Sequence, residues 1–124
     1  MAVTKRQITS VEELADYFEK KGDLHDCVVE LLQWQPSAKF IEIKLLDVNA
    51  NFLGLSEYEG LTPCVMKLKE VSDVSFSISS PDEKLRVYEV QLSALEGRAS
   101  LKMLFSPSGS MELSFREVDF FELN

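Results

Sequence analysis

The only histidine of the chain lies in Leu24-His25-Asp26-Cys27, a tetrapeptide whose residue types could do chemistry. A histidine beside an aspartate can supply two metal ligands, but metal-assisted hydrolysis needs further histidine and aspartate ligands. The chain has no second histidine among its 124 residues. We therefore interpret His25 and Asp26 as a structural junction, in which their polar side chains satisfy free backbone groups between a helix and a strand.

Cys27 could act as a thiol nucleophile if a base lay within hydrogen-bond distance. In a strand, residues 25 and 27 face the same way about 7 Å apart, which is too far for a direct ion pair. The acidic neighbourhood would also raise the pKa of the thiol. The chain has no Cys-x-x-Cys motif, so we expect Cys27 and Cys64 to be reduced core residues of two different strands.

A second set of oxygen ligands follows the pattern Asp47-x-Asn49-x-Asn51, which matches the first three ligand positions of an EF-hand calcium loop. The match ends there, because Phe52 stands where the loop needs glycine and Tyr58 where it needs a bidentate glutamate. An irregular calcium site that includes Glu57 and Glu59 is one alternative. We expect instead that the three motif residues are turn residues bonded to their own backbone.

No glycine-rich phosphate loop and no nucleophile-elbow motif is present, so the sequence predicts no enzyme activity and no cofactor. The hydrophobic fraction of 45% and the charged fraction of 27% are typical of one globular domain over residues 1–124. The net charge of −8 disfavours nucleic acid and anionic membranes, and it permits a basic protein partner. In the simpler alternative, the charge only keeps the protein soluble.

The first residues are not followed by an apolar segment of the kind found in signal peptides. No apolar run approaches the roughly 18 residues that a membrane span requires. The sequence therefore predicts a cytoplasmic protein.

The polar residues 1–9 are expected to form an arm, and residues 10–22 a helix. Ser10 and Glu13 form a capping box at its start, and Gly22 is suited to the position just past its end. Helical spacing then produces one apolar stripe, formed by Val11, Leu14, Ala15 and Phe18.

Beyond the helix, residues 24–123 show the period of strands. Residues 27–34 and the alternating Phe40–Leu45 predict an antiparallel hairpin, and residues 47–63 predict a long loop. Further strands are expected around 64–69, 71–78 (with a bulge near Ser72 and Asp73), 85–92, 101–105, 111–115 and 118–123, with a turn at 79–83. No second helix could cross between parallel strands. We therefore expect an α+β fold, with one N-terminal helix packed on a curved, mainly antiparallel sheet of six to eight strands, barrel-like or sandwich-like.

The order of these features resembles a group of small uncharacterised bacterial α+β domains, in which a capped helix precedes a Leu-His-Asp-small strand. The resemblance is carried by Leu24 to Cys27, by Phe40-Ile41-Glu42-Ile43 and by Leu68-Lys69-Glu70-Val71. Some of these domains are predicted to be immunity proteins of toxin systems. The resemblance implies binding of a partner without catalysis, and it assigns no site residue.

The leading hypothesis from the sequence is a non-enzymatic binding protein, an immunity-type inhibitor of a basic protein partner. The acidic surface would steer the partner, and the long loop would then be buried against it. The candidate contact residues are Phe52, Glu57, Tyr58 and Glu59. The alternative is a binder of a small molecule or lipid that uses the interior of the curved sheet.

Overall fold

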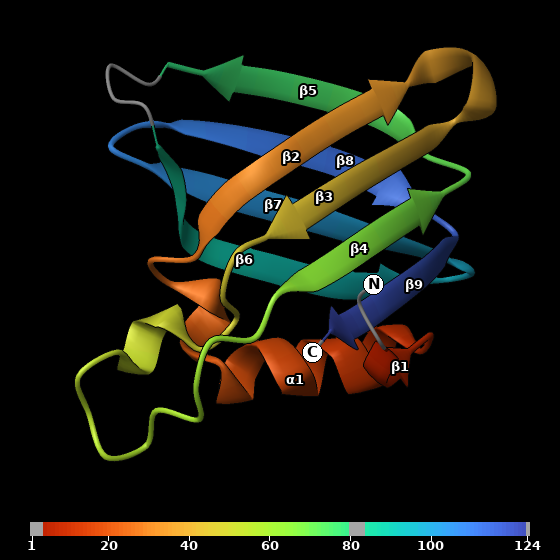
Figure 1. Ribbon diagram of the computed structural model, residues 1–124. Coiled ribbons are helices and arrows are strands. Elements are labelled where there is room, and N and C mark those ends of the chain that lie inside the picture. The colour runs from red at the N-terminus through yellow and green to blue at the C-terminus, as the bar shows by residue number, and fades with distance from the viewer. Residues whose placement is uncertain (1–3, 80–83, 124) are drawn as a thin grey trace.

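The computed structural model describes residues 4–79 and 84–123 (Figure 1). The predicted helix is present as α1 (Val11–Lys20). The hydroxyl of Ser10 accepts a hydrogen bond from the amide of Glu13 at 3.2 Å, as the capping box predicts. The helix ends at Lys20, short of the predicted residue 22, because Gly22–Leu24 form a separate short 3-10 turn, η1.

The described residues form nine strands in one open, curled antiparallel sheet of order β1-β9-β4-β3-β2-β6-β7-β8-β5. The α+β prediction is therefore confirmed. The strands are β1 (Thr4–Ile8), β2 (Val28–Gln35), β3 (Phe40–Leu45), β4 (Cys64–Lys69), β5 (Ser72–Ile78), β6 (Leu85–Leu95), β7 (Arg98–Ser106), β8 (Gly109–Phe115) and β9 (Glu117–Leu123). Two more 3-10 turns, η2 (Pro36–Ala38) and η3 (Ala50–Phe52), lie in the connections.

The prediction of a polar arm over residues 1–9 is wrong for Thr4–Ile8, which form the edge strand β1. This strand pairs with β9, where Ile8 lies opposite Phe120 and is completely buried. The polar sequence of β1 has no strand pattern, but pairing with the edge of β9 supplies the backbone hydrogen bonds that hold it as a strand. The strand raises the count to nine, above the predicted six to eight. Residues 80–83 of the predicted 79–83 turn lie outside the described residues.

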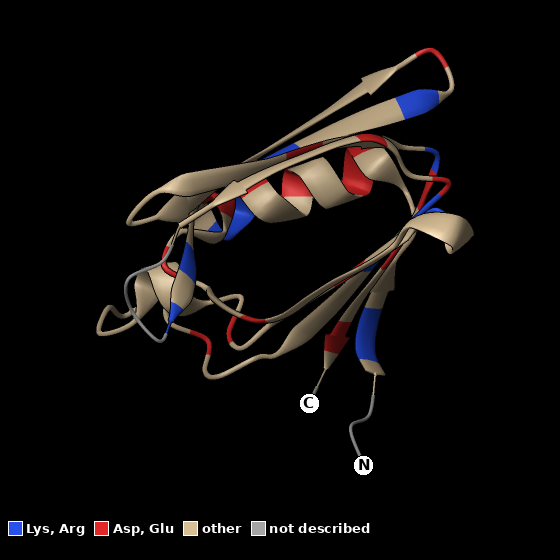
Figure 2. Ribbon diagram, turned by 90° about the horizontal axis from the view of Figure 1, so that it is seen from above, with Lys and Arg blue, Asp and Glu red and all other residues tan. Residues whose placement is uncertain are grey.

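The sheet bends back on itself where β2 meets β6. Within the described residues these two strands pair only at Val28 and Val29, opposite Arg86 and Leu85. Beyond that point β2 diverges with β3, β4, β9 and β1 into one layer, while β6, β7, β8 and β5 form the other (Figures 1 and 2). The helix α1 lies along one side of the space between the two layers.

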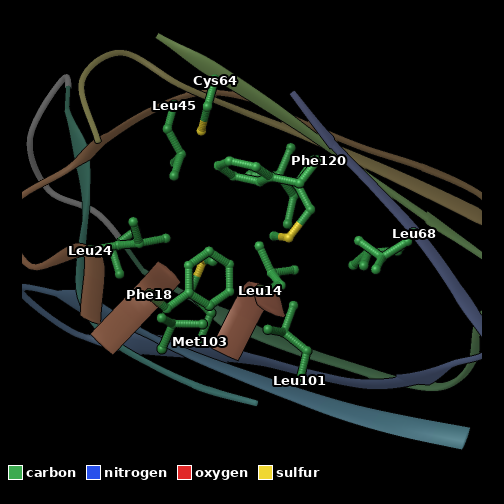
Figure 3. Close-up of a cluster of buried hydrophobic side chains, with 14 of the residues drawn as sticks. Leu14, Phe18, Leu24, Leu45, Cys64, Leu68, Leu101, Met103 and Phe120 are labelled. Carbon is green, nitrogen blue, oxygen red and sulfur yellow. The ribbon is translucent and has the colours of Figure 1, made fainter. Parts of the chain in front are cut away.

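The apolar stripe of α1 fills this space. Leu14 and Phe18 point into the interior, where they meet Met103 of one layer and Phe120 of the other (Figure 3). All four side chains are at most 2% exposed. Burial of each such side chain contributes about 1.5–3 kcal/mol, so the helix is a major part of the core.

The helix reaches β2 through a backbone with several left-handed residues. Gly22, Asp23, Leu24 and Asp26 have φ values of +67°, +56°, +61° and +68°. For the three non-glycine residues this conformation costs about 1–2 kcal/mol each. Complete burial of the Leu24 side chain offsets part of that cost. The amide of Asp26 also donates to the carbonyl of Val87 at 2.8 Å, which ties the junction to β6.

Replacement of Gly22 by alanine should destabilise the protein, because a Cβ at this left-handed position would lie 2.1 Å from Nδ2 of Asn51. We expect the free energy of unfolding to fall by at least about 2 kcal/mol in urea titrations. Gly54→Ala is the matched control, because Gly54 has φ +87° but a Cβ there would meet no atom within 4 Å. Gly54→Ala should lower the free energy of unfolding by about 1 kcal/mol. Equal losses in the two variants would contradict the close approach to Asn51.

Candidate functional site

His25 and Asp26 lie at the junction between η1 and β2, with side chains that are 40% and 57% exposed. Nδ1 of His25 donates to the carbonyl of Tyr88 at 2.9 Å, and its ring meets the Tyr88 ring edge to face. The other ring nitrogen, Nε2, lies 3.7 Å from Oδ1 of Asp26. The histidine thus joins the junction to β6 through a backbone carbonyl.

The two cysteines are free and completely or almost completely buried. Burial, followed by the negative charge of Asp47, raises the pKa of the Cys27 thiol to about 12. Burial also raises the pKa of Cys64 well above its usual range. The thiol of Cys27 donates to the carbonyl of Asp47 at 3.0 Å. The raised pKa values disfavour the thiolate form of both cysteines near neutral pH.

Asp47 organises the long loop between β3 and β4. One carboxylate oxygen, Oδ1, accepts the amides of Asn49 at 3.0 Å and of Thr62 at 3.1 Å. The other oxygen accepts the hydroxyl of Tyr58 at 2.8 Å, and this hydrogen bond raises the pKa of that tyrosine. The side chain of Asp47 is buried, and its oxygens are engaged within the loop. The predicted role of Asp47 as a turn residue bonded to its own backbone is confirmed.

Asn49 continues this network to the helix. Its Nδ2 donates to the carbonyl of Gly60 at 2.8 Å and lies 3.2 Å from the hydroxyl oxygen of Thr62. Its Oδ1 accepts a hydrogen bond of 2.6 Å from Nζ of Lys21, which also lies 3.6 Å from a carboxylate oxygen of Glu59. The loop is therefore attached to the end of α1. Among the described residues, no group of three or more histidine, cysteine or acidic side chains is arranged to hold a metal ion.

Leucine side chains, more than aromatic ones, are exposed on this loop. Phe52 and Tyr58, two of the predicted contact residues, are half-buried. Leu53, Leu55 and Leu61 are 69%, 57% and 64% exposed. Sequence reasoning missed the leucines because an apolar residue is expected to be inside. The signal that could have found them is their position in a segment that has neither strand nor helix periodicity.

Two of these leucines, Leu53 and Leu61, border a groove of about 680 Å³ that lies between the loop and the junction. Leu46, Leu53 and Leu61 contribute apolar surface to it, and Asp26 and Arg86 contribute charge. We call the exposed leucines Leu46, Leu53, Leu55 and Leu61 the leucine surface. The remaining predicted contacts, Glu57 and Glu59, are exposed on the same loop. Of the predicted contact residues, the structure brings Tyr58 to this groove together with the junction residue Asp26.

The interior of the sheet gives less room for a ligand. The space between the two layers is occupied by buried side chains of the helix and of both layers, as Figure 3 shows around Leu14 and Phe120. A filled interior counts against the alternative of a small molecule or lipid held inside the curved sheet.

Comparisons with protein-family models, with curated protein sequences and with solved structures found no match. In the described part of the chain, no helix combines the length and the apolar character that a membrane span needs.

Replacement of Asp47 by alanine should loosen the loop and lower stability, because the amides of Asn49 and Thr62 would lose their acceptor. We expect the free energy of unfolding to fall by about 2–4 kcal/mol. Glu57→Ala removes an exposed carboxylate from the same loop and should leave the stability within about 0.5 kcal/mol of the original. Urea titrations of both variants test this. A loss below about 1 kcal/mol for Asp47→Ala would show that the loop does not depend on its hydrogen bonds.

Proposed function

We propose that the protein is a non-enzymatic binding protein of the immunity type, which inhibits a basic protein partner by covering part of its surface. The observation that carries this proposal is the leucine surface. It places apolar side chains in solvent on a loop whose backbone is held by the buried Asp47 and Asn49. A surface that is already ordered loses little conformational entropy when a partner binds, and this favours affinity.

The net charge of −8 supports a basic partner. Figure 2 shows acidic positions along α1 and in the connecting segments. Such a charge speeds the approach of a cationic protein, and the exposed Glu57 and Glu59 add carboxylates to the loop that carries the exposed leucines. Protein interfaces usually have an apolar core, which loses its water on binding, and a polar rim. Exposed leucines with charged residues on the same loop could form such a core and rim. The same cluster would disfavour an acidic partner.

We propose that the half-buried Phe52 and Tyr58 support the loop and do not themselves make the main contacts with the partner. Tyr58 holds the loop through its hydrogen bond to Asp47, and its ring also lines the groove beside Leu53 and Leu61. The direct contacts are assigned to the leucines and to the two glutamates.

The proposal is tested by affinity capture from the native cell at near-physiological salt, with mass spectrometry to identify the captured protein. A triple variant, Leu53→Ser, Leu55→Ser and Leu61→Ser, should lose capture of that protein by at least tenfold. Each leucine is more than half exposed, so the triple variant should unfold at nearly the same urea concentration as the original chain.

Ile78→Ser is the matched control, because Ile78 is 42% exposed but lies at the end of β5, outside the leucine surface. It should capture the partner as well as the original protein. Recovery of no basic protein, or equal capture by the triple variant and the original chain, would contradict the proposed function.

A further inference from the structure

Two separate hollows lie one after the other between α1 and β6, and we call them together the groove. Its first part, of about 520 Å³, is lined from the helix by Ala15 and Glu19 and from β6 by Glu89 and Gln91. Its second part, of about 360 Å³, lies toward the start of the helix, between Glu12 and the end of β6. The helix lies beneath β6 and follows it in Figure 1, and the two elements are in contact.

The wall that β6 contributes to this groove is an open sheet edge. Within residues 4–79 and 84–123, β6 has β7 as its neighbour along its length, but β2 reaches it only at Leu85 and Arg86. Val87 is still tied to the junction, since its amide and carbonyl both form backbone hydrogen bonds there. From Glu89 onward, no described strand pairs with β6 on the side of the helix.

The register shows which backbone groups face that side. Leu95 and Arg98 lie opposite each other across the two-residue turn between β6 and β7. Residues that flank such a turn exchange hydrogen bonds with each other, and every second residue before them does the same. The intervening residues Val90, Leu92 and Ala94 therefore direct their N–H and C=O groups away from β7, toward the groove.

The dimensions fit an extended peptide. The open edge covers residues 89–95, which at about 3.3 Å per residue is roughly 20 Å long. The helix beside it has ten residues and is about 15 Å long. An exposed sheet edge is a place where an extended peptide can bind by adding a strand to the sheet.

The charge of the groove selects the kind of peptide. Glu19, Asp23 and Glu89 line its first part, and no lysine or arginine of the described segments lines it with them. In the second part the carboxylates of Glu12 and Glu96 are balanced by two further lining residues, Arg98 and Arg116. A segment with cationic side chains opposite the first part is therefore favoured.

We propose that the groove between α1 and β6 binds an extended basic segment of the protein partner, which adds to the edge of β6 as a further strand. Backbone groups of Val90, Leu92 and Ala94 hydrogen-bond to the segment, and Glu19, Asp23 and Glu89 bind its cationic side chains. The inference rests on the proposed function for the charge of the partner, but it concerns a surface separate from the leucine surface.

The test uses a synthetic probe, an acetylated seven-residue peptide of alternating lysine and valine, titrated into the isotopically labelled protein at low salt. We expect the amide signals of Val90, Leu92 and Ala94 to shift and their hydrogen exchange to slow. A peptide in which lysine is replaced by glutamate should bind at least tenfold more weakly. A peptide methylated on alternate backbone nitrogens should also bind at least tenfold more weakly, because it cannot form all the backbone hydrogen bonds to β6.

Two variants separate the backbone and the charge contributions. Ala94→Pro removes a backbone N–H that points away from β7 and leaves the hydrogen bonds between β6 and β7 in place. It should weaken binding of the lysine peptide by at least tenfold. Ala94→Ser is the control and should bind this peptide as tightly as the original protein does. Combined Glu19→Gln, Asp23→Asn and Glu89→Gln should weaken it about five- to tenfold. The charge-matched control neutralises three exposed carboxylates elsewhere, Glu30, Glu70 and Glu112, and should change binding less than twofold.

The outcomes for the two surfaces are distinguishable. The triple leucine variant should still bind the lysine peptide, so loss of partner capture with retained peptide binding supports the groove as a separate surface. If no basic protein is captured but the lysine peptide still adds to β6, the proposed function is wrong, while binding of a basic segment in the groove is still supported. Equal binding of the lysine and glutamate peptides, or signal shifts confined to residues 46–63, would overturn the inference.

Discussion

The packing of α1 between the two layers of the sheet is the constraint on which the rest of the structure depends. In the described part of the chain, β2 and β6 pair at two residues of each strand and then diverge, so the space between the two layers must be closed by another element. Leu14, Tyr17 and Phe18 close that space from one side. The hydroxyl of Tyr17 donates to the buried carboxylate of Glu122 on β9, which joins the helix to the layer opposite β6. Burial, and then the hydrogen bond to Glu122, raises the pKa of the Tyr17 hydroxyl.

Both proposed binding surfaces follow from the position of this helix. The residue that follows its last turn, Lys21, reaches Asn49, and through Asn49 the helix supports the loop that carries the leucine surface. Its outer side runs beside the free edge of β6 and completes the acidic groove. The left-handed residues after Gly22 are needed for the chain to leave the helix and enter β2 over so short a distance. The strain of that junction is therefore a cost of placing the helix where it closes the core.

Sequence reasoning identified the elements whose signals are local. The capping box at Ser10 located the start of α1, and strict alternation located β3 and β4, whose buried and exposed residues follow the predicted faces. The bulge predicted near Ser72 and Asp73 is present, since the register of β5 shifts there. The strand state of Thr4–Ile8 could not be predicted in this way, because it is decided by the free edge of β9, more than a hundred residues away in the chain.

The candidate site shows the same division between local and distant information. Asp47 bonds to nearby backbone as predicted, but its bonds to Tyr58 and Thr62 join residues 11 and 15 positions away. Those contacts turn a segment without periodicity into an ordered loop, and they explain why Tyr58 supports the surface while leucines are exposed on it. The open edge of β6 is likewise a consequence of strand order, which no local pattern encodes.

The proposed function requires that the loop between β3 and β4 is ordered before any partner arrives. Amide hydrogen exchange on the unbound protein tests it most directly. We expect the amides of Asn49 and Thr62, which donate to Asp47, to exchange as slowly as ladder amides of β3 and β4. Exchange of both amides at the rate of an unstructured peptide would contradict this claim.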